Sequence, residues 1–293
     1  MLPQLLDKEA VRVSAYPLQP LADVLAQIPG ATAFAFHLDC TKTGFFPSCR
    51  AELIALLKQH GLAVLNESVT DISKRFLQHA CRRLGLPSVA TERNSCPVEC
   101  PFEEVMVKTD LNYGGETESM LSSAELQAMH ITLHPSPIQR FNEYKVLRRK
   151  DVPDEWWDHP ALVIERYIDN RHNRKHRVYF AGDRYAVSVT IDTQKIKKFR
   201  PENSNQEYLS DEATFTLAAN TQLPASLQPD IVRLLRHLKI DFGAVDFVED
   251  DTGQCYVIDL NATSYGKALS PDAVQHLRRG LFARIDALRV PGD

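Results

Sequence analysis

Apolar residues recur with two different periods in the first part of the chain. The short apolar runs "ATAFAFHL" and "LAVLN" predict strands, while "CRAELIALLKQHG" between them has apolar residues at helical spacing and ends in glycine. A second helix is predicted over "SVTDISKRFLQHACRRLGLP", with Thr70 or Asp71 at its start and a glycine and a proline at its end. Residues 31 to 90 therefore predict a small α/β domain with parallel strands, preceded by an irregular arm with one short helix.

Beyond residue 102 the pattern changes to one that predicts antiparallel strands. "FEEVMVKTDLNYGGETE" is a strand that enters a loop with paired glycines, "LVIERYI" is a further strand, and "HRVYFAGDRYAVSVT" predicts a hairpin that turns at Gly182 and Asp183. The amphipathic stretch "PDIVRLLRHLKI" predicts a helix, and residues 243 to 261 predict a second hairpin with its turn at "DDTG". A last helix is predicted to follow the start signal "SPD" at residue 270.

Length and composition narrow the class of protein. With 293 residues, 44% hydrophobic and 25% charged, the chain is typical of a globular protein with two domains or one large composite. A net charge of −4 favours neither a nucleic acid nor a membrane as partner. The start "MLPQLLDKEA" lacks the pattern of a signal peptide, and no uncharged apolar run is long enough to span a bilayer, so we expect a cytoplasmic location.

The six cysteines predict reduced thiols and not a disulfide framework, because the chain is long and has no secretory signal. Cys96 and Cys100 form the only close pair, and no second Cys/His pair follows at a spacing that would complete a zinc site. We therefore expect loop cysteines here. The chain also has no glycine-rich dinucleotide fingerprint, which argues against NAD or flavin.

The hairpin from 243 to 261 carries the most informative candidate chemistry. Asp246 lies on its first predicted strand, while Asp259 and Asn261 lie two residues apart on its second and therefore share a face. Two carboxylates and an amide oxygen suit Mg²⁺ that also keeps water and phosphate oxygens as ligands. The alternative is that Asp259 and Asn261 only end the strand in an Asx turn, and the pattern leaves both interpretations open.

Two lysines are candidates for binding an anion. Lys108 interrupts an apolar strand, and since a buried unpaired lysine is costly it should face an anion or a carboxylate. The following glycines, Gly114 and Gly115, can bring backbone N–H groups close to phosphates, although paired glycines more often form a simple turn. Lys74 lies near the start of a predicted helix, where a charge alone indicates only a solvated face.

A strand with an acidic end and two basic clusters complete the candidates. In "LVIERYIDN", Glu165 could accept from an adenine amino group, or it could be a surface acid on an edge strand. Basic residues cluster at 171–177 and 195–200, and such runs are usually solvated loops. Arg177 enters a predicted strand and is the member of these clusters that we expect to face an anion.

In this order the features resemble the ATP-grasp superfamily, which includes glutathione synthetase, D-alanine:D-alanine ligase and the ribosomal-protein glutamate ligases. The resemblance spans residues 31 to 270, and "VIDLNATSYG" is similar to the family ending "E-V-N-x-x-P-G", with aspartate for glutamate and no proline. It implies an α/β (α+β) ATP-grasp fold in which a small pre-ATP-grasp domain precedes two α+β lobes that clamp ATP. We expect the arm and pre-domain at 1–95, the central lobe at 96–165 and the C-terminal lobe at 166–293.

The same resemblance implies roles in nucleotide binding. Lys74 and Lys108 would hold the α- and β-phosphates, Lys108 would also serve catalysis, and the loop with Gly114 and Gly115 would close over the nucleotide as a mobile lid. Residues after the last central strand would line the adenine slot and reach the ribose: Glu165, Tyr167, Ile168 and Asp169.

It also implies the reaction centre and the activity. Arg177 would stabilise the transferred phosphoryl group, and two Mg²⁺ ions, or Mn²⁺ in their place, would be bound by Asp246, Asp259 and Asn261. The implied activity is ligation of a carboxylate to an amine through an acyl phosphate, driven by ATP. Small-molecule substrates such as an amino acid or peptide are expected as partners, without nucleic acid or membrane, and the resemblance allows a homodimer.

Two other functions stay open at this stage. A kinase of the inositol phosphate kinase type shares the fold, and the basic clusters could bind a polyanionic acceptor. A non-catalytic nucleotide-binding module is the third interpretation, which a complete set of lysines and metal-type residues disfavours. Neither substrate is identified, because the segments expected to select them, residues 134–150 and 200–210, are predicted only as loops.

Overall fold

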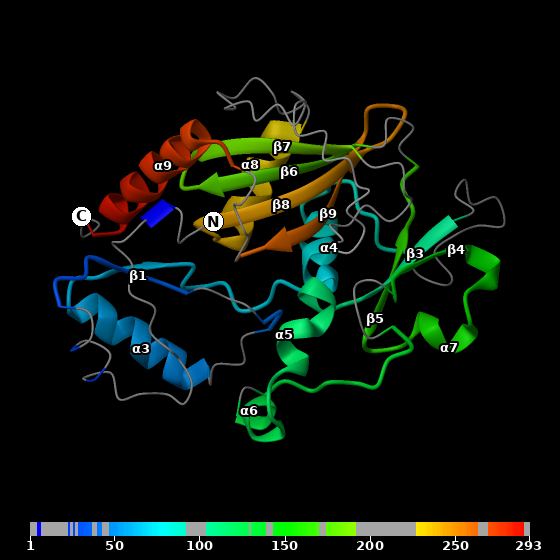
Figure 1. The fold of residues 1–293 in the computed structure, drawn as a ribbon, viewed down its shortest axis with the longest axis horizontal. Helices are drawn as coiled ribbons and strands as arrows, with labels where there is room; N and C mark the ends of the chain where they lie inside the picture. The colour runs from blue at the N-terminus through cyan, green and yellow to red at the C-terminus, as the bar shows by residue number, and fades with distance from the viewer. Residues whose placement is uncertain are drawn as a thin grey trace.

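The computed structural model describes the greater part of the chain, namely residues 5–6, 23, 26, 29–36, 40–42, 47–91, 104–128, 130–138, 143–169, 174–191, 227–262 and 269–289. Within these ranges the strands form three sheets, and the fold is of the mixed α+β class. Figure 1 shows the four-stranded sheet above the other two, with helix α4 between them. The pair Cys96 and Cys100, the basic cluster 195–200 and the loop 200–210 lie outside the described residues.

The first sheet confirms the predicted parallel strands. Strands β1 (Ala33–Ala35) and β2 (Ala63–Leu65) pair in parallel, with Ala33 opposite Ala63. The connection between them contains helix α3 (Pro47–Gln59), which ends two residues before Gly61. Gly61 has a φ of 74°, a left-handed conformation that glycine adopts without the steric cost of a Cβ.

The second sheet is the central one, and it contains a strand that the pattern did not predict. Strand β3 (Glu104–Thr109) pairs antiparallel with β4 (Lys145–Arg148) on one side and with β5 (Leu162–Arg166) on the other. The expectation of a loop over 134–150 was therefore wrong in part. Strand β4 has only two apolar residues between two charged ones, which is too short a pattern to distinguish a strand from a loop.

The third sheet confirms both predicted hairpins. Its strand order is β7-β6-β8-β9, and every neighbouring pair is antiparallel. The first hairpin turns at Gly182 and Asp183, and the second turns at 250–253, where the Asp250 carboxylate accepts from the N–H groups of residues 252 and 254. The strands are β6 (Arg174–Ala181), β7 (Arg184–Ile191), β8 (Phe242–Glu249) and β9 (Cys255–Asn261).

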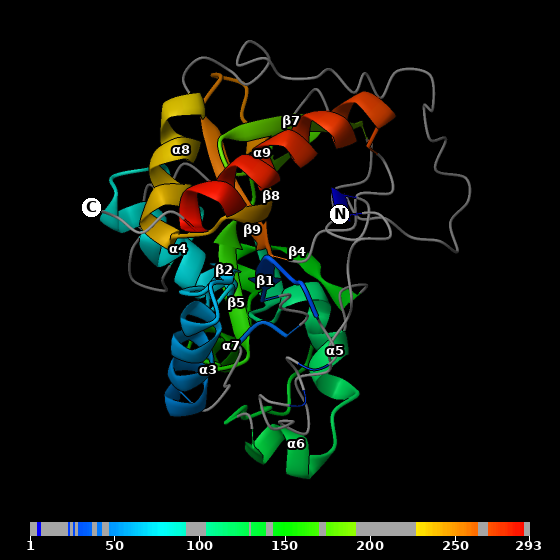
Figure 2. The same cartoon turned by 90° about the vertical axis from the view of Figure 1, so that its left-hand side faces the viewer.

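Helices cover the two faces of this sheet (Figure 2). Helix α8 (Leu227–Leu238) buries its apolar stripe with side chains such as Phe180 and Phe247 on one face. Helix α9 (Pro271–Arg289) covers the other face, where its apolar residues meet Tyr179, Phe242 and β2. It passes so close to the β6–β7 turn that a Cβ on Gly280 would collide with the backbone oxygen of Ala181.

Helix α4 (Lys74–Arg83) connects the three sheets and begins later than predicted. It packs against α8 and β9, although it belongs to the N-terminal part of the chain. The N-cap is Ser73, and neither Thr70 nor Asp71 serves, because the Asp71 carboxylate bonds to the N–H of Ser73 in a local turn at 2.7 Å. The Ser73 hydroxyl then accepts from the N–H of Phe76 at 3.3 Å.

The buried side chain of Gln78 joins α4 to two other segments. Its Nε2 donates to the carbonyl of Val257 in β9 at 2.8 Å, and its Oε1 accepts from the N–H of Val89 at 3.0 Å and the hydroxyl of Ser88 at 2.9 Å. Residues 88–91 run beside the end of β5, where Ala90 bridges to Glu165. One amide thus ties the helix to β9 and to the segment beside β5.

A second buried amide joins the parallel sheet to the four-stranded sheet. Asn66, directly after β2, donates its N–H to the Asp241 carboxylate at 2.6 Å, and its Oδ1 accepts from the N–H of Asp241 at 2.7 Å. Arg284 of α9 completes the contact with the other Asp241 oxygen at 2.7 Å. These bonds fix β2 against the start of β8.

Apart from Arg166, the last residue of β5, each sheet falls within one of the three expected chain segments. The boundaries at 95 and 165 stay a prediction, since α4 packs on a strand of the third segment. No helix in the described part of the chain has the length and apolarity needed to cross a membrane. Short helical segments that the pattern did not predict are Asn112–Gly115, Glu116–Ser119 (α5), Ser123–Ala128 (α6), Arg149–Asp151 and Asp154–Trp157 (α7).

Gln78→Ala should lower the free energy of unfolding by about 3 kcal/mol, because it leaves buried backbone groups without hydrogen-bond partners. Urea denaturation followed by circular dichroism measures this. The matched control is Gln59→Ala at the exposed end of α3, which should change the free energy of unfolding by less than about 0.5 kcal/mol. Equal effects of the two substitutions would contradict the role given to Gln78.

Candidate functional site

The four-stranded sheet carries a row of charged side chains across three adjacent strands. Arg177 of β6 lies opposite Asp246 of β8, and Asp246 lies opposite Asp259 of β9, so the three side chains share one face. Asn261 follows two residues after Asp259 on the same face, and its Nδ2 donates to Asp259 Oδ2 at 3.3 Å. The residues expected at the metal site are therefore neighbours.

Asp246 is the buried centre of this row and is already paired with two cations. Arg177 binds it in a two-pronged contact, with Nε 2.5 Å from Oδ1 and Nη2 2.8 Å from Oδ2, and Lys175 Nζ lies 3.3 Å from Oδ2. Burial alone would raise the pKa of Asp246, but Arg177 and Lys175 outweigh it and hold the pKa well below its usual range. Asp246 is therefore ionised at neutral pH.

In this row, Asp259 and Asn261 are better suited than Asp246 to bind Mg²⁺. Both Asp246 oxygens are engaged by cations, whereas Asp259 and Asn261 are half-buried and each keeps an oxygen outside their mutual bond. Over the described ranges, His, Cys, Asp and Glu side chains form no group of three or more that could hold a metal ion. A metal here would take one carboxylate and one amide oxygen from the chain, and water or phosphate oxygens for the rest.

The central sheet carries a buried ion pair between Lys108 and Glu165. Met106 lies opposite Glu165, which places Lys108 and Glu165 on the same face of β3 and β5, and Lys108 Nζ contacts Glu165 Oε2. Only 7% and 4% of the two side chains are exposed, so the alternative of a surface acid at Glu165 was wrong. The second oxygen, Glu165 Oε1, is buried without a hydrogen-bond partner.

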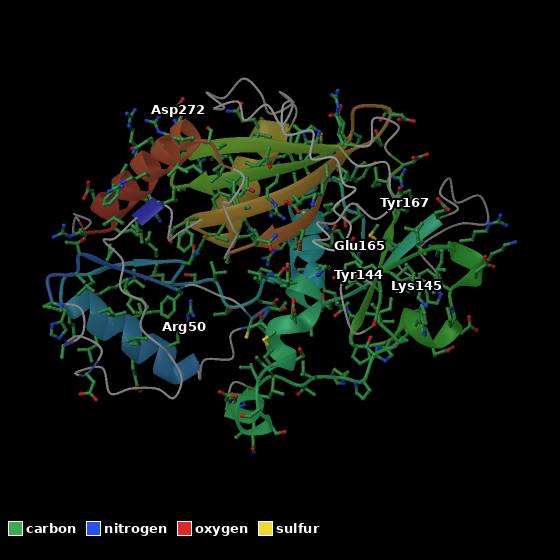
Figure 3. All side chains as sticks on the ribbon, in the orientation of Figure 1. Arg50, Tyr144, Lys145, Glu165, Tyr167 and Asp272 are labelled. Carbon is green, nitrogen blue, oxygen red and sulfur yellow. The ribbon has the colours of Figure 1, made fainter. Side chains whose placement is uncertain are left out.

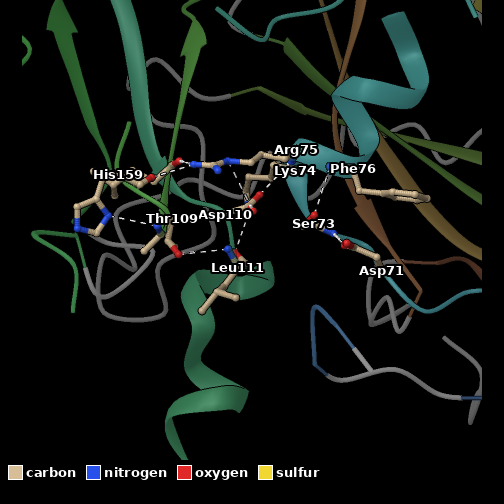
Figure 4. A network of polar contacts seen from close by, with 11 residues as sticks. Asp71, Ser73, Lys74, Arg75, Phe76, Thr109, Asp110, Leu111 and His159 are labelled. Carbon is tan, nitrogen blue, oxygen red and sulfur yellow. Dashed lines mark hydrogen bonds and ion pairs between the residues drawn. The ribbon is translucent and has the colours of Figure 1, made fainter. Parts of the chain in front are cut away.

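Lys74 is also buried, which overturns the interpretation of a solvated face. It is the first residue of α4, and its Nζ donates to the backbone oxygen of Leu111 at 2.7 Å, at the start of the glycine loop (Figure 4). The loop itself contains three successive residues with positive φ: Tyr113 (49°), Gly114 (74°) and Gly115 (79°).

The glycine loop is bonded to the N-terminal part of the chain through Thr41. The Thr41 hydroxyl accepts from the N–H of Asn112 at 2.5 Å, and the Thr41 N–H donates to the buried Glu118 carboxylate at 2.6 Å. A Cβ on Gly115 would lie 2.6 Å from the Leu111 side chain, so a larger residue would displace that side chain. Closure of this loop as a lid stays a prediction.

Tyr144 lies where the central sheet and the four-stranded sheet approach each other (Figure 3). It is buried directly before β4, and burial raises the pKa of its hydroxyl above the usual range. Lys108 opposes this shift, while the carboxylates of Asp259, Glu165 and Asp110 add to it. The Tyr144 side chain is buried in the apolar cluster of the central sheet, together with Val105 and Val107.

The residues after β5 differ in how deeply they are buried. Ile168 is buried with Val89 and Tyr256, Tyr167 is half-buried and donates its N–H to the Glu104 oxygen at 3.1 Å, and Asp169 is exposed. Burial raises the pKa of Tyr167, and Asp169 adds to the shift. Ile168 therefore joins this segment to the four-stranded sheet.

Sequence patterns missed three residues that contribute to this site. Tyr144 belongs to no motif, and Asp110 is distinguished only by its position two residues after the strand lysine Lys108. Lys175 lay within the basic cluster that was expected to be solvated, and only its pairing with Asp246 distinguishes it from that cluster.

No protein-family model and no curated protein matches this sequence. Solved structures that match include the ATP-grasp ligase PsnB with minimal precursor, Mg and ADP, at 13% identity, 82% of this chain, 68% of that chain and a TM-score of 0.48. A RiPP-associated ATP-grasp ligase of Chryseobacterium gregarium matches at 14% identity, 84% and 71% coverage and a TM-score of 0.47.

D-alanine-D-alanine ligase from Coxiella burnetii matches at 13% identity over 81% of this chain and 64% of that chain, with a TM-score of 0.43. For macrocyclase MdnC of Microcystis aeruginosa MRC, the identity is 12% over 72% of this chain, the TM-score is 0.41, and the match spans 59% of that chain's length. All four TM-scores lie below 0.5, so the function proposed below rests on the residues of this chain.

Asp246→Asn should lower the free energy of unfolding by about 3 kcal/mol at pH 7, because it leaves Arg177 and Lys175 without their counter-charge. The lowered pKa means that the carboxylate's contribution is complete at neutral pH and is lost as the pH falls below about 4. The difference between wild type and variant should therefore shrink in acid.

Urea denaturation of both proteins at pH 7, 5, 4 and 3 measures this difference. The matched control is Asp286→Asn on the exposed side of α9, for which the difference should stay within about 0.5 kcal/mol at each pH. A difference for Asp246→Asn that grows as the pH falls would contradict the assigned ion pairs.

Proposed function

We propose that this protein is an ATP-dependent carboxylate–amine ligase with an ATP-grasp architecture. The observation that carries the proposal is that the chain holds two polar sets, one on the central sheet and one on the four-stranded sheet, and that Ile168, two residues after the end of β5 in the central sheet, packs against Tyr256 of the four-stranded sheet. One is the buried pair of Lys108 and Glu165, and the other is the row that ends in Asp259. Cations for phosphates and oxygen donors for a metal are the two requirements of phosphoryl transfer.

The buried lysines support binding of the nucleotide phosphates. Lys74 and Lys108 are each paired within the protein, with the Leu111 carbonyl and with Glu165 respectively. Under the proposal the α- and β-phosphates take these ammonium groups as partners, and the glycine loop with Gly114 and Gly115 supplies backbone N–H groups. Internal pairing offsets the free-energy cost of burying the two lysines, and binding of phosphates would give their burial a function.

The end of β5 supports binding of the adenosine part. Glu165 Oε1 is a buried acceptor without a partner, as an exocyclic adenine amino group requires. Ile168 supplies an apolar wall, Tyr167 an aromatic side chain beside it, and the exposed Asp169 a carboxylate for ribose hydroxyls. The proposed adenine slot therefore has one polar contact and apolar walls.

The row on the four-stranded sheet supports the chemical step. Asp259 and Asn261, with Asp246 beside them, would hold Mg²⁺, and the ion would supply positive charge that neutralises the phosphates. Arg177 is held in place by Asp246 and would stabilise the charge that develops on the transferred group. The substrate carboxylate would attack the γ-phosphorus, forming an acyl phosphate and releasing ADP. The amine would then form the amide bond and displace inorganic phosphate, which requires that water be excluded.

The substrates that we propose are a small carboxylate and an amine, such as an amino acid or a peptide. The chain segments 1–95, 96–165 and 166–293 would form the pre-domain and the two lobes of the clamp. Phosphorylation of a stable acceptor by the same site is the competing outcome, and the products distinguish the two reactions.

The test is a phosphate-release assay with ATP and Mg²⁺ against a panel of amino acids, peptides and small carboxylic acids, with mass spectrometry of the products. We expect phosphate release that depends on a pair of substrates and a product whose mass is their sum less water. A product heavier by one phosphoryl group would replace the ligase with a kinase. ATP binding without turnover across the panel would count against catalysis by this site.

Asp259→Asn should reduce Mg²⁺-dependent ATP turnover by at least about a hundredfold, since it removes the carboxylate proposed to bind the metal. The thermal midpoint should change little because Asp259 is only half-buried. The matched control is Asp251→Asn in the turn of the same hairpin, which should retain wild-type turnover. Unchanged turnover of Asp259→Asn in an active wild-type background would refute the assignment.

A further inference from the structure

Asp110 occupies the junction between the central sheet and helix α4. It directly follows β3, it is buried, and its backbone N–H donates to the carbonyl of Ala161, just before β5, at 2.9 Å. Its side chain turns to the first residues of α4, where Oδ1 accepts from the backbone N–H of Arg75 at 3.0 Å (Figure 4). Asp110 thus bonds both to the segment before β5 in the central sheet and to helix α4.

The start of α4 depends on this carboxylate. The first backbone N–H groups of a helix have no partner within the helix, and the hydroxyl of Ser73 serves the N–H of Phe76. The N–H of Arg75 is served by Asp110, which lies far from it in sequence. A carboxylate at this end also interacts favourably with the helix dipole.

The side chain of Arg75 makes a second connection between α4 and the central sheet. Its guanidinium donates to the carbonyls of His159 (2.9 Å) and Leu162, and its Nε lies 3.9 Å from Asp110 Oδ2. Arg75 is half-exposed, so its ion pair adds little energy. The partly buried hydrogen bond from the Arg75 N–H to the Asp110 carboxylate holds the register of α4 against β3 and β5.

Both buried lysines lie within two residues of this junction. Lys108 precedes Asp110 by two residues on β3, and Lys74 is the first residue of α4, with its N–H 3.5 Å from the Asp110 carbonyl. The Nζ of Lys74 bonds to the carbonyl of the next residue, Leu111. The contacts of Asp110 therefore set where Lys74 lies relative to Lys108.

We propose that Asp110 is a positioning residue that fixes the spacing of Lys74 and Lys108 for a polyphosphate ligand. The proposal rests on the function proposed above, because it assigns the two lysines to phosphates. Asp110 itself acts through Lys74 and does not touch the ligand. Removing its acceptor leaves the N–H of Arg75 without a partner and lets the start of α4 move away from β3.

The test is isothermal titration calorimetry of ADP with Mg²⁺, and of tripolyphosphate, against wild type and a set of variants. Asp110→Ala should weaken binding by about tenfold, the size expected when a helix loses a capping carboxylate on which binding depends. Asp110→Asn should lose less than about threefold, because its amide oxygen still accepts from the Arg75 N–H.

Two comparisons separate positioning from general stability. Ser73→Ala removes the other side-chain bond at the same helix end and should lower the thermal midpoint while changing the dissociation constant by less than about twofold. In a Lys74→Ala background, Asp110→Ala should weaken binding by less than about twofold further, because the residue acts through the missing lysine. If Asp110→Ala does not fold, Asp110→Glu replaces it, since the longer side chain moves the carboxylate away from Arg75.

The outcomes distinguish this proposal from the proposed function. If wild type binds, three results would overturn the role of Asp110 and leave the proposed function standing. These are unchanged binding by Asp110→Ala, a fully additive loss in the double variant, and a loss in Ser73→Ala equal to that in Asp110→Ala. Wild-type protein that binds neither ADP nor tripolyphosphate would overturn the nucleotide-binding function, and this proposal with it.

Discussion

Helix α4 is the part of the structure on which the arrangement of the site depends. At its start it is bonded to the end of β3 through Asp110, and in its middle the buried amide of Gln78 is bonded to β9 and to residues 88–91. Its apolar side packs among side chains of α8 and the four-stranded sheet. Because a buried hydrogen-bonding group is costly when it loses its partner, these contacts hold the sheets in one relative position.

Each buried charged group of the site has a partner inside the protein. Lys108 is paired with Glu165, Lys74 with a backbone carbonyl, and Asp246 with two cations. A buried charge without a partner would be very unfavourable, so each group must have one when no ligand is bound. A polyphosphate and a divalent cation would bind here by exchanging partners, which makes the affinity depend on how well the lysines and carboxylates are positioned beforehand.

The pairing of Asp246 with two cations changes the roles expected for the three residues of the proposed metal site. The sequence suggested three oxygen ligands, whereas the register of β6, β8 and β9 places a cation directly beside one of them. Asp246 therefore orients Arg177, and the half-buried Asp259 and Asn261 are the accessible donors.

The sequence by itself determined the local elements and the candidate residues. Strong periodicity predicted α3, α8, α9, both hairpins and the parallel pair β1–β2, because amphipathic spacing and turn residues are local properties. It missed β4, whose two apolar residues form no clear period, and it placed the start of α4 at the wrong cap. Only the tertiary structure decided that Lys74 and Glu165 are buried, that Lys175 pairs with Asp246, and that Tyr144 and Asp110 are buried as well. Burial and charge pairing arise between residues distant along the chain, and no local pattern records which strands and helices will meet.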